Sequence, residues 1–135
     1  MAKFLAQDFK ITLAGVNLSN NIKSAELQVQ SEDKETSAFG DGWKTHIAGL
    51  KSGSVKLDFL QDFGAASVEA TIYPLLGTLA TVVITPTSGT VSATNPSYTA
   101  VCLVNSHTPV SGAVGDVATF SVTWPTSGTV VKAIV

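Results

Sequence analysis

Hydrophobic and polar residues alternate with a strict period of two in three segments of the N-terminal half. The hydrophobic positions of the three segments are Phe9, Ile11 and Leu13; Ala25, Leu27 and Val29; and Val55, Leu57 and Phe59. Because successive side chains of a β-strand point to opposite faces, this pattern is typical of strands with one face on a core and one in water. The sequence therefore predicts three such strands, the first of which ends at Gly15.

The segment between the second and third predicted strands, residues 31–53, is long for a connection between strands. It begins with a charged cluster and continues with hydrophobic residues among glycines: Glu32, Asp33 and Glu35, then Phe39, Trp43 and Ile47. Loops of this length usually carry a function or are disordered. Its hydrophobic side chains either fold back onto the core or dock onto a partner, and the pattern leaves both open.

One helix is predicted, at about residues 65–76, where one hydrophobic face is formed by Val68, Ile72, Leu75 and Leu76. Pro74 is expected to kink or end its last turn. Three further strands are predicted after the helix, at residues 79–85, 98–105 and 117–124. The expected fold is therefore mainly β, with one flanking α-helix and a long loop between the second and third strands.

The motif Pro-x-Ser-Gly-x-Val follows each of these last three strands, beginning at Pro86, Pro109 and Pro125. Proline cannot donate to a β-ladder and ends a strand, while Ser-Gly suits a turn. The copies are unequally spaced, whereas repeat proteins have a fixed period. We therefore interpret the motif as a turn that ends a strand and occurs three times, not as a structural repeat. The apolar segment after its last copy, residues 130–135, is expected to pair with a neighbouring molecule.

The composition favours one domain, residues 1–135, with little affinity for nucleic acid. The chain has eight lysines, no arginine and a net charge of −2, so it lacks the basic surface and the planar guanidinium groups of tight DNA binders. Its first residues do not resemble a signal peptide, and no apolar run reaches the length of a membrane span. We expect synthesis in a cytoplasm and no membrane partner.

Charge is distributed unevenly along the chain. From residue 70 onward the only formally charged side chains are Asp116 and Lys132. Free monomers usually spread charges of both signs over their surface. This half is therefore either a neutral, Thr-rich β surface or a surface largely covered by neighbouring copies.

Candidate catalytic and ligand-binding residues are few. His46 and His107 lie in different contexts and are interpreted as surface or loop residues, and Cys102, inside an apolar run, as a buried thiol. The acidic cluster at residues 32–35 lacks a calcium-loop pattern and is interpreted as solvated. No phosphate-binding loop, dinucleotide fingerprint, zinc spacing or nucleophile motif occurs in the sequence. We expect no enzyme activity, no cofactor and no metal.

Several stretches together resemble the phage tail tube (major tail) proteins, in particular the short single-domain type of actinobacterial phages and prophages. These stretches are DFKITLAGVNLSNNIKSAEL, AFGDGWKTHIAGLKSGSVKLDFLQDF, TPTSGTVSATNPSYTA and TPVSGAVGDVATFSVTWPTSG. The resemblance implies a β-sandwich or half-barrel. It also implies that six copies form a ring, that rings stack into a hollow tube for DNA, and that the inner strands of neighbours join into one barrel.

The resemblance also implies partners and surfaces. The partners would be the chain itself together with tape-measure, tail-terminator and baseplate or tip proteins, with DNA only in transit, in the tail of a virion. The segment 31–53 would be the assembly loop, with its inter-ring contacts made by Glu32, Asp33, Glu35, Phe39, Trp43, His46 and Ile47. Candidates for the lumen wall are the polar strand faces Ser24, Glu26, Gln28 and Gln30, and Ser54, Lys56 and Asp58.

Two points stay open at the level of sequence. Lys56 departs from an acidic lining, so it either pairs with an acid or lies on a face that is not luminal. The alternative function is a β-sandwich receptor-binding or adhesive module on a virion or cell surface, which would be a discrete particle rather than a polymer.

Overall fold

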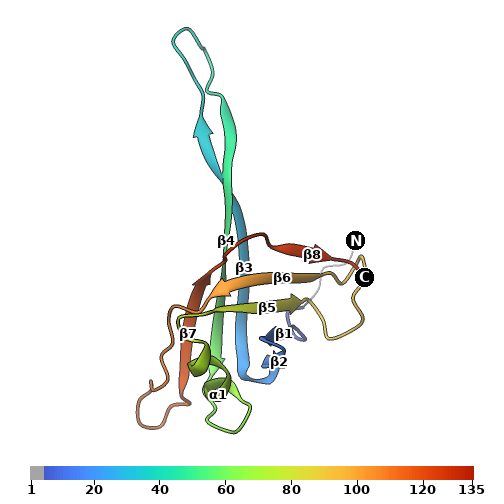
Figure 1. Cartoon of the computed structure of the whole chain (residues 1–135), viewed down its shortest axis with the longest axis vertical. Helices are drawn as coiled ribbons and strands as arrows, with labels where there is room; N and C mark the ends of the chain where they lie inside the picture. The colour runs from blue at the N-terminus through green and yellow to red at the C-terminus, as the bar shows by residue number, and fades with distance from the viewer. Residues whose placement is uncertain (1–4) are drawn as a thin grey trace.

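The computed structural model describes residues 5–135. Strands dominate it (Figure 1), and their bounds are β1 (Lys10–Leu13), β2 (Val16–Asn17), β3 (Ile22–Glu35), β4 (His46–Leu60), β5 (Leu79–Thr85), β6 (Ser97–Leu103), β7 (Thr119–Pro125) and β8 (Val131–Ala133). The short helices are η1 (Ser19–Asn21), α1 (Val68–Ile72) and η2 (Tyr73–Leu75). The expected mainly β fold with one flanking helix is confirmed.

Two antiparallel sheets form the body of the molecule. One has five strands in the order β2-β1-β5-β6-β8, and the other has three in the order β3-β4-β7. Their facing sides meet in a core of fully buried side chains, among them Leu57, Phe59, Val82 and Trp124. The alternation seen in the sequence therefore marks which side of each strand faces the core. Over the described residues the two sheets do not close into a barrel.

The β3–β4 hairpin is much longer than the sequence pattern predicts. Its ladder pairs Ile22 with Phe59 at one end and Glu35 with His46 at the other, so only residues 36–45 form a loop. Most of the predicted loop 31–53 is thus strand. Outside the body neither face of this ribbon is buried, and a strand exposed on both faces carries no hydrophobic alternation. In Figure 1 the hairpin rises far above the body.

The helical segment is shorter than predicted. Ala66 has a positive φ of 58°, and the α-helix begins only at Val68. As expected, the α-helix ends near Pro74: it is followed directly by the 3-10 helix η2, which contains this proline. Val68 and Ile72 are buried against the sheets. None of the helices within residues 5–135 is long and apolar enough to cross a membrane.

The C-terminal segment corrects one expectation. Residues 131–133 pair with β6 of the same chain, opposite Ser97–Thr99, and not with a neighbouring molecule as expected. The segment keeps exposed apolar side chains, including Val135. Pro86 directly follows β5 and Pro125 is the last residue of β7, as predicted for strand-ending prolines. Pro109 lies several residues beyond the end of β6.

Candidate assembly surfaces

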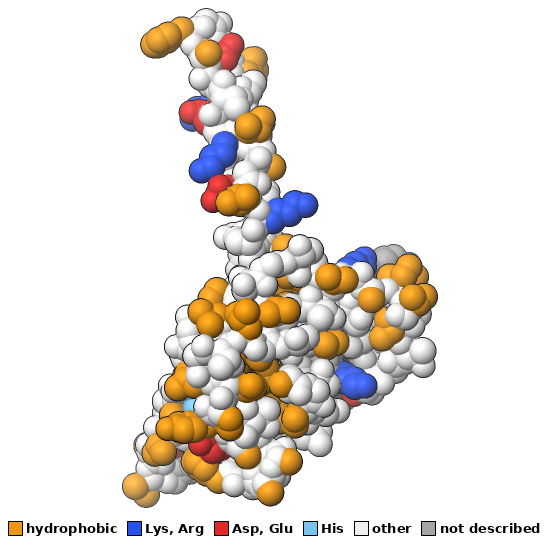
Figure 2. All heavy atoms as spheres, viewed as in Figure 1, with side chains coloured by type: hydrophobic (Ala, Val, Ile, Leu, Met, Phe, Trp, Pro, Cys, Tyr) orange, Lys and Arg blue, Asp and Glu red, His pale blue; other side chains and the backbone are white. Residues whose placement is uncertain are grey.

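The projecting part of the hairpin, residues 31–53, is here called the arm. It brings all the predicted inter-ring residues onto one narrow ribbon that stands clear of the body, as Figure 2 shows. These residues are Glu32, Asp33, Glu35, Phe39, Trp43, His46 and Ile47. Every one of them is exposed in the isolated subunit.

The tip of the arm, residues 36–45, is organised by its own hydrogen bonds. The hydroxyls of Thr36 and Thr45 lie 2.7 Å apart, and the backbone N–H of Thr45 donates to the hydroxyl of Ser37 at 2.9 Å. Phe39 and Trp43 project from this loop with exposed fractions of 110% and 88%. They do not fold back onto the core, which was one of the two sequence-based alternatives, and docking onto a partner stays a prediction.

The charges of the arm pair with one another along the ribbon. His46 Nδ1 lies 2.7 Å from Asp33 Oδ1, and Lys34 Nζ lies 3.4 Å from Glu32 Oε2. Exposed pairs of this kind contribute little stability. Within residues 5–135 no three His, Cys, Asp or Glu side chains gather as metal ligands would. The acidic cluster is therefore a solvated, partly self-paired surface.

The outer face of the three-stranded sheet collects the predicted lumen residues into rows. Ser24, Asp58 and Ser121 form one row across β3, β4 and β7, and the Ser121 hydroxyl donates to the Asp58 carboxylate. Glu26 and Lys56 are cross-strand partners in the next row. Glu26 thus lies opposite Lys56 in the ladder, and the position of this face in a lumen stays a prediction. Gln28 and Ser54 face each other in the row after that, and Gln30 follows on β3.

An apolar groove of about 460 Å³ opens under the free edge of β3. The inward side chains of Leu27 and Val29 form one wall, and Ile84, Pro86 and Tyr98 contribute to the other. Val29 lines this groove and is still 55% exposed. A free strand edge above an apolar groove is the kind of surface that proteins normally cover.

The end of the body opposite the arm carries a second apolar surface, here called the base. It consists of the loop before α1, the α1–η2 segment and the β6–β7 loop (residues 104–118), all at the lower end of Figure 1. Its exposed hydrophobic residues are Phe63, Tyr73, Leu76, Val110, Val114 and Val117. Leu76 was expected on the packed face of the helix but is 45% exposed, and the sequence pattern does not mark the other residues as a surface. The available signal was the shortage of charge after residue 70.

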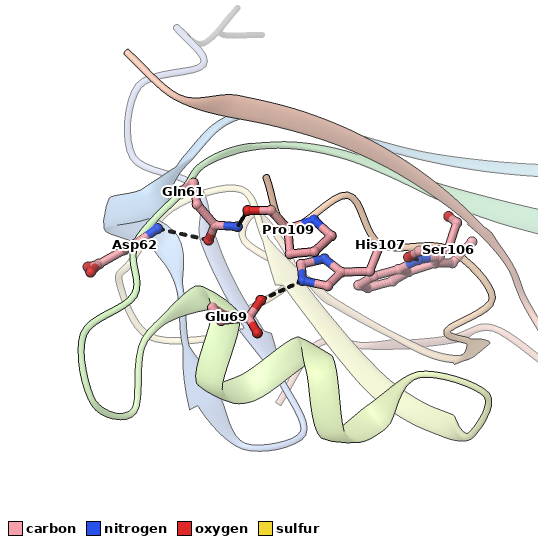
Figure 3. A network of polar contacts seen from close by, with 7 residues as sticks. Gln61, Asp62, Glu69, Ser106, His107 and Pro109 are labelled. Atoms are coloured by element: carbon pink, nitrogen blue, oxygen red, sulfur yellow. Dashed lines mark hydrogen bonds and ion pairs between the residues drawn. The ribbon is translucent and has the colours of Figure 1, made fainter. Parts of the chain in front are cut away.

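A buried polar contact holds the β6–β7 loop against α1 (Figure 3). The side chain of His107 is 1% exposed, and its Nε2 lies 2.8 Å from Oε2 of Glu69, so an Nε2–H donates to the carboxylate. The ring packs edge-on against Phe120 with centroids 5.0 Å apart. His107 is in a loop as predicted but not on the surface. Its partner lies 38 residues earlier, a distance at which no sequence pattern links them.

Three titratable groups of the body have shifted pKa values: Cys102, Asp62 and Asp8. Burial raises the pKa of the Cys102 thiol to about 11, which keeps it an unreactive core side chain, as predicted. The backbone N–H of Gly64 and the hydroxyl of Ser67 lower the pKa of Asp62, which fixes the turn into α1. A hydrogen bond from the Ser88 hydroxyl likewise lowers the pKa of Asp8.

The whole fold matches a known virion chain. A chain in the structure of the virion of a native gene transfer agent (GTA) particle superimposes with a TM-score of 0.77 and 11% sequence identity. The superposition covers 97% of this chain and 99% of that chain. No protein-family profile matches the sequence, and no curated protein matches it significantly. At this identity the likeness shows a shared fold.

Proposed function

We propose that this chain is a structural virion protein, the subunit of a phage-type tail tube. Six copies close into a ring, and rings stack into a hollow tube through which DNA passes. The observation that carries this proposal is the arm, which presents Phe39 and Trp43 to solvent on a body with the fold of a virion chain. An exposed aromatic pair on a projecting hairpin is costly for a lone subunit and suits a partner.

Sideways contact within the ring would use the free edges of the three-stranded sheet. β3 and β7 are its two outer strands, so β3 of one copy can pair with β7 of the next. Such pairing removes exposed edges and, repeated around a ring, gives one continuous barrel. Covering the edge of β3 would also cover the apolar groove beside Leu27 and Val29. The alternating polar face would then line the lumen.

The chemistry of that polar face suits DNA in transit. Over β3 and β4 it carries Glu26, Lys56 and Asp58 among serines and glutamines. Lys56 lies opposite Glu26, so no row presents an unbalanced positive charge. Without a cluster of cations there is little counterion release to hold DNA in place. The proposed partners are further copies and, at the ends of the tube, tape-measure, terminator and baseplate or tip proteins, in the tail of a virion assembled in a host cytoplasm.

Negative-stain microscopy of the purified protein tests the proposal directly. We expect hexameric rings or hollow rods. Trp43→Ala should abolish long rods while leaving a folded subunit, and Trp43→Phe, which keeps an aromatic anchor, should retain most assembly. Monodisperse particles without rings would instead favour the receptor-binding or adhesive module, and normal rods from Trp43→Ala would remove Trp43 as an anchor.

A further inference from the structure

Two identical copies of the sequence Pro-Thr-Ser-Gly-Thr-Val, at residues 86–91 and 125–130, are used differently by the fold. In the first copy the hydroxyl of Thr87 accepts from the backbone N–H of Gly89 at 3.3 Å, so this bond stays inside the turn. In the second copy the hydroxyl of Thr126 donates to the backbone carbonyl of Gly53 at 3.2 Å, 73 residues away in the sequence. Ending a strand does not require this long-range bond.

The turn at Thr126 is the last support of β4 before the arm leaves the body. The ladder between β4 and β7 ends at Pro125. One residue further on, the carbonyl of Gly53 accepts two bonds from Thr126, one from the hydroxyl and one from the backbone N–H at 3.0 Å. The N–H of Ser127 then donates to the carbonyl of Val101 in β6 at 2.7 Å. The turn therefore ties the root of the arm to both sheets.

The root is closely packed on one side and open on the other. A Cβ on Gly53 would lie 2.8 Å from a backbone carbonyl oxygen of β3 and 3.3 Å from the hydroxyl of Thr126. Beside the turn, a hollow of about 410 Å³ lies between Lys51 and Ser52 of the arm and residues 128–130. Figure 1 shows the chain between β7 and β8 crossing the arm at its root. The arm has space to tilt into this hollow unless the turn holds it.

A small rotation at the root becomes a large displacement at the tip. About 11 residues separate Gly53 from Gly42 in the tip loop, which is about 36 Å of extended chain. A tilt of about 10° at the root therefore moves the tip sideways by about 6 Å. Apolar contact needs heavy atoms within about 4.5 Å. The direction of the arm thus decides whether Phe39 and Trp43 meet a partner surface.

We propose that Thr126 is a positioning residue for the arm, and that with Gly53 it forms a clamp that fixes the direction in which the arm leaves the body. This inference rests on the proposed function, in which the arm is the element that docks. An arm held in one direction before assembly loses less conformational entropy when it binds. Without the hydroxyl, the backbone bond to Gly53 is a single pivot, so the arm is freed while the body stays folded.

Substitutions in the two identical turns separate clamping from packing. Thr126→Val keeps the shape of the side chain and removes its hydroxyl, and Thr126→Ser restores the hydroxyl. Thr87→Val is the matched control, because it makes the same change in the same motif at a residue that is also partly buried. Spin labels on Gly42→Cys in the tip and Lys132→Cys in β8 report the direction of the arm through their distance distribution, in protein dilute enough to be monomeric. The thiol of Cys102 is buried and stays unlabelled.

We expect Thr126→Val to raise the fraction of arms outside the wild-type distance peak about fivefold, which is the effect of one typical hydrogen bond on an equilibrium. Because every copy of a ring must dock its arm, the fraction of unlabelled protein in long rods should fall about threefold in negative-stain microscopy. Thr126→Ser should match wild type, and Thr87→Val should change neither measurement. All variants should keep a cooperative thermal unfolding transition.

Three results would overturn the clamp: an unchanged distance distribution for Thr126→Val, a Thr126→Ser variant as mobile as Thr126→Val, or equal broadening by Thr87→Val. The distance measurement does not depend on assembly, so it separates this inference from the proposed function. Wild-type protein that forms neither rings nor rods, but whose narrow distance distribution depends on the Thr126 hydroxyl, would support the clamp and overturn the tube function.

Discussion

The two tryptophans of this chain show how differently its two regions are built. Trp124 in β7 has no exposed surface and its Nε1 donates to the Ser106 carbonyl. Trp43 at the arm tip is 88% exposed and touches no core. In the body hydrophobic side chains are buried and stabilise the fold, whereas in the arm they are exposed to solvent. The same residue type can therefore serve folding in one region and association in the other.

Replacing each tryptophan separates these roles with the largest expected effect. Trp124→Ala should destabilise the body by about 3–5 kcal/mol, because it leaves a large cavity and removes a hydrogen bond. Trp43→Ala should change stability by less than about 0.5 kcal/mol. Urea unfolding followed by circular dichroism, at concentrations where the subunit is monomeric, measures both. Equal losses of stability would mean that the arm packs on the body in solution.

Two glutamates give the second comparison. Glu69→Ala leaves the buried His107 side chain without its partner and should cost about 1–3 kcal/mol. Glu32→Ala removes only an exposed arm pair with Lys34 and should cost less than about 1 kcal/mol. The same unfolding experiment distinguishes them. A neutral Glu69→Ala would show that the β6–β7 loop is not held by His107.

The sequence predicts the strands of the body better than those of the arm. In the body, an apolar stretch and the proline that follows it predict the strand at residues 79–85, which has the bounds of β5. In the arm the ladder continues through charged and polar residues, where alternation disappears because both faces meet water. Hydrophobic pattern reports burial, so it does not detect a strand that buries neither face.

Sequence patterns are limited in the same way for the candidate assembly surfaces. Phe39 and Trp43 could be singled out because aromatic residues are unexpected in a solvated loop. The base could not, since its valines come from an ordinary Thr/Val-rich stretch and only the fold brings the β6–β7 loop beside α1. The burial of His107 depends on the same long-range contact with Glu69. Residues that meet only through tertiary structure leave no local signal.

Two glycines test the junction between the regions. At the root of the arm a Cβ on Gly53 would lie 2.8 Å from the backbone carbonyl oxygen of Gln28, so the partner strand would have to shift. Gly53→Ala should therefore cost about 1 kcal/mol. Gly42, in the tip loop, has open space around it, and Gly42→Ala should leave stability unchanged or slightly raised. Thermal unfolding of both variants decides whether the arm root is as tightly packed as the body.

Two aspartates give the smallest effect and the one that depends on pH. The pKa of Asp62 lies below its ordinary value of 3.8 because the Gly64 N–H, Ser67 and Asn21 bond the ionised carboxylate. A carboxyl whose pKa is lowered on folding stabilises the native state above its unfolded pKa, and this contribution disappears as the pH falls through the folded value. Asp62→Asn should therefore lower stability at pH 7 and flatten its decline below about pH 4. Asp33→Asn, on the exposed arm, should leave the unfolding curve at pH 7 unchanged within about 0.5 kcal/mol. If Asp33→Asn were the more destabilising of the two at pH 7, the arm would need the contact between Asp33 and His46 to fold. The contrast between a self-supporting body and a solvent-exposed arm would then fail.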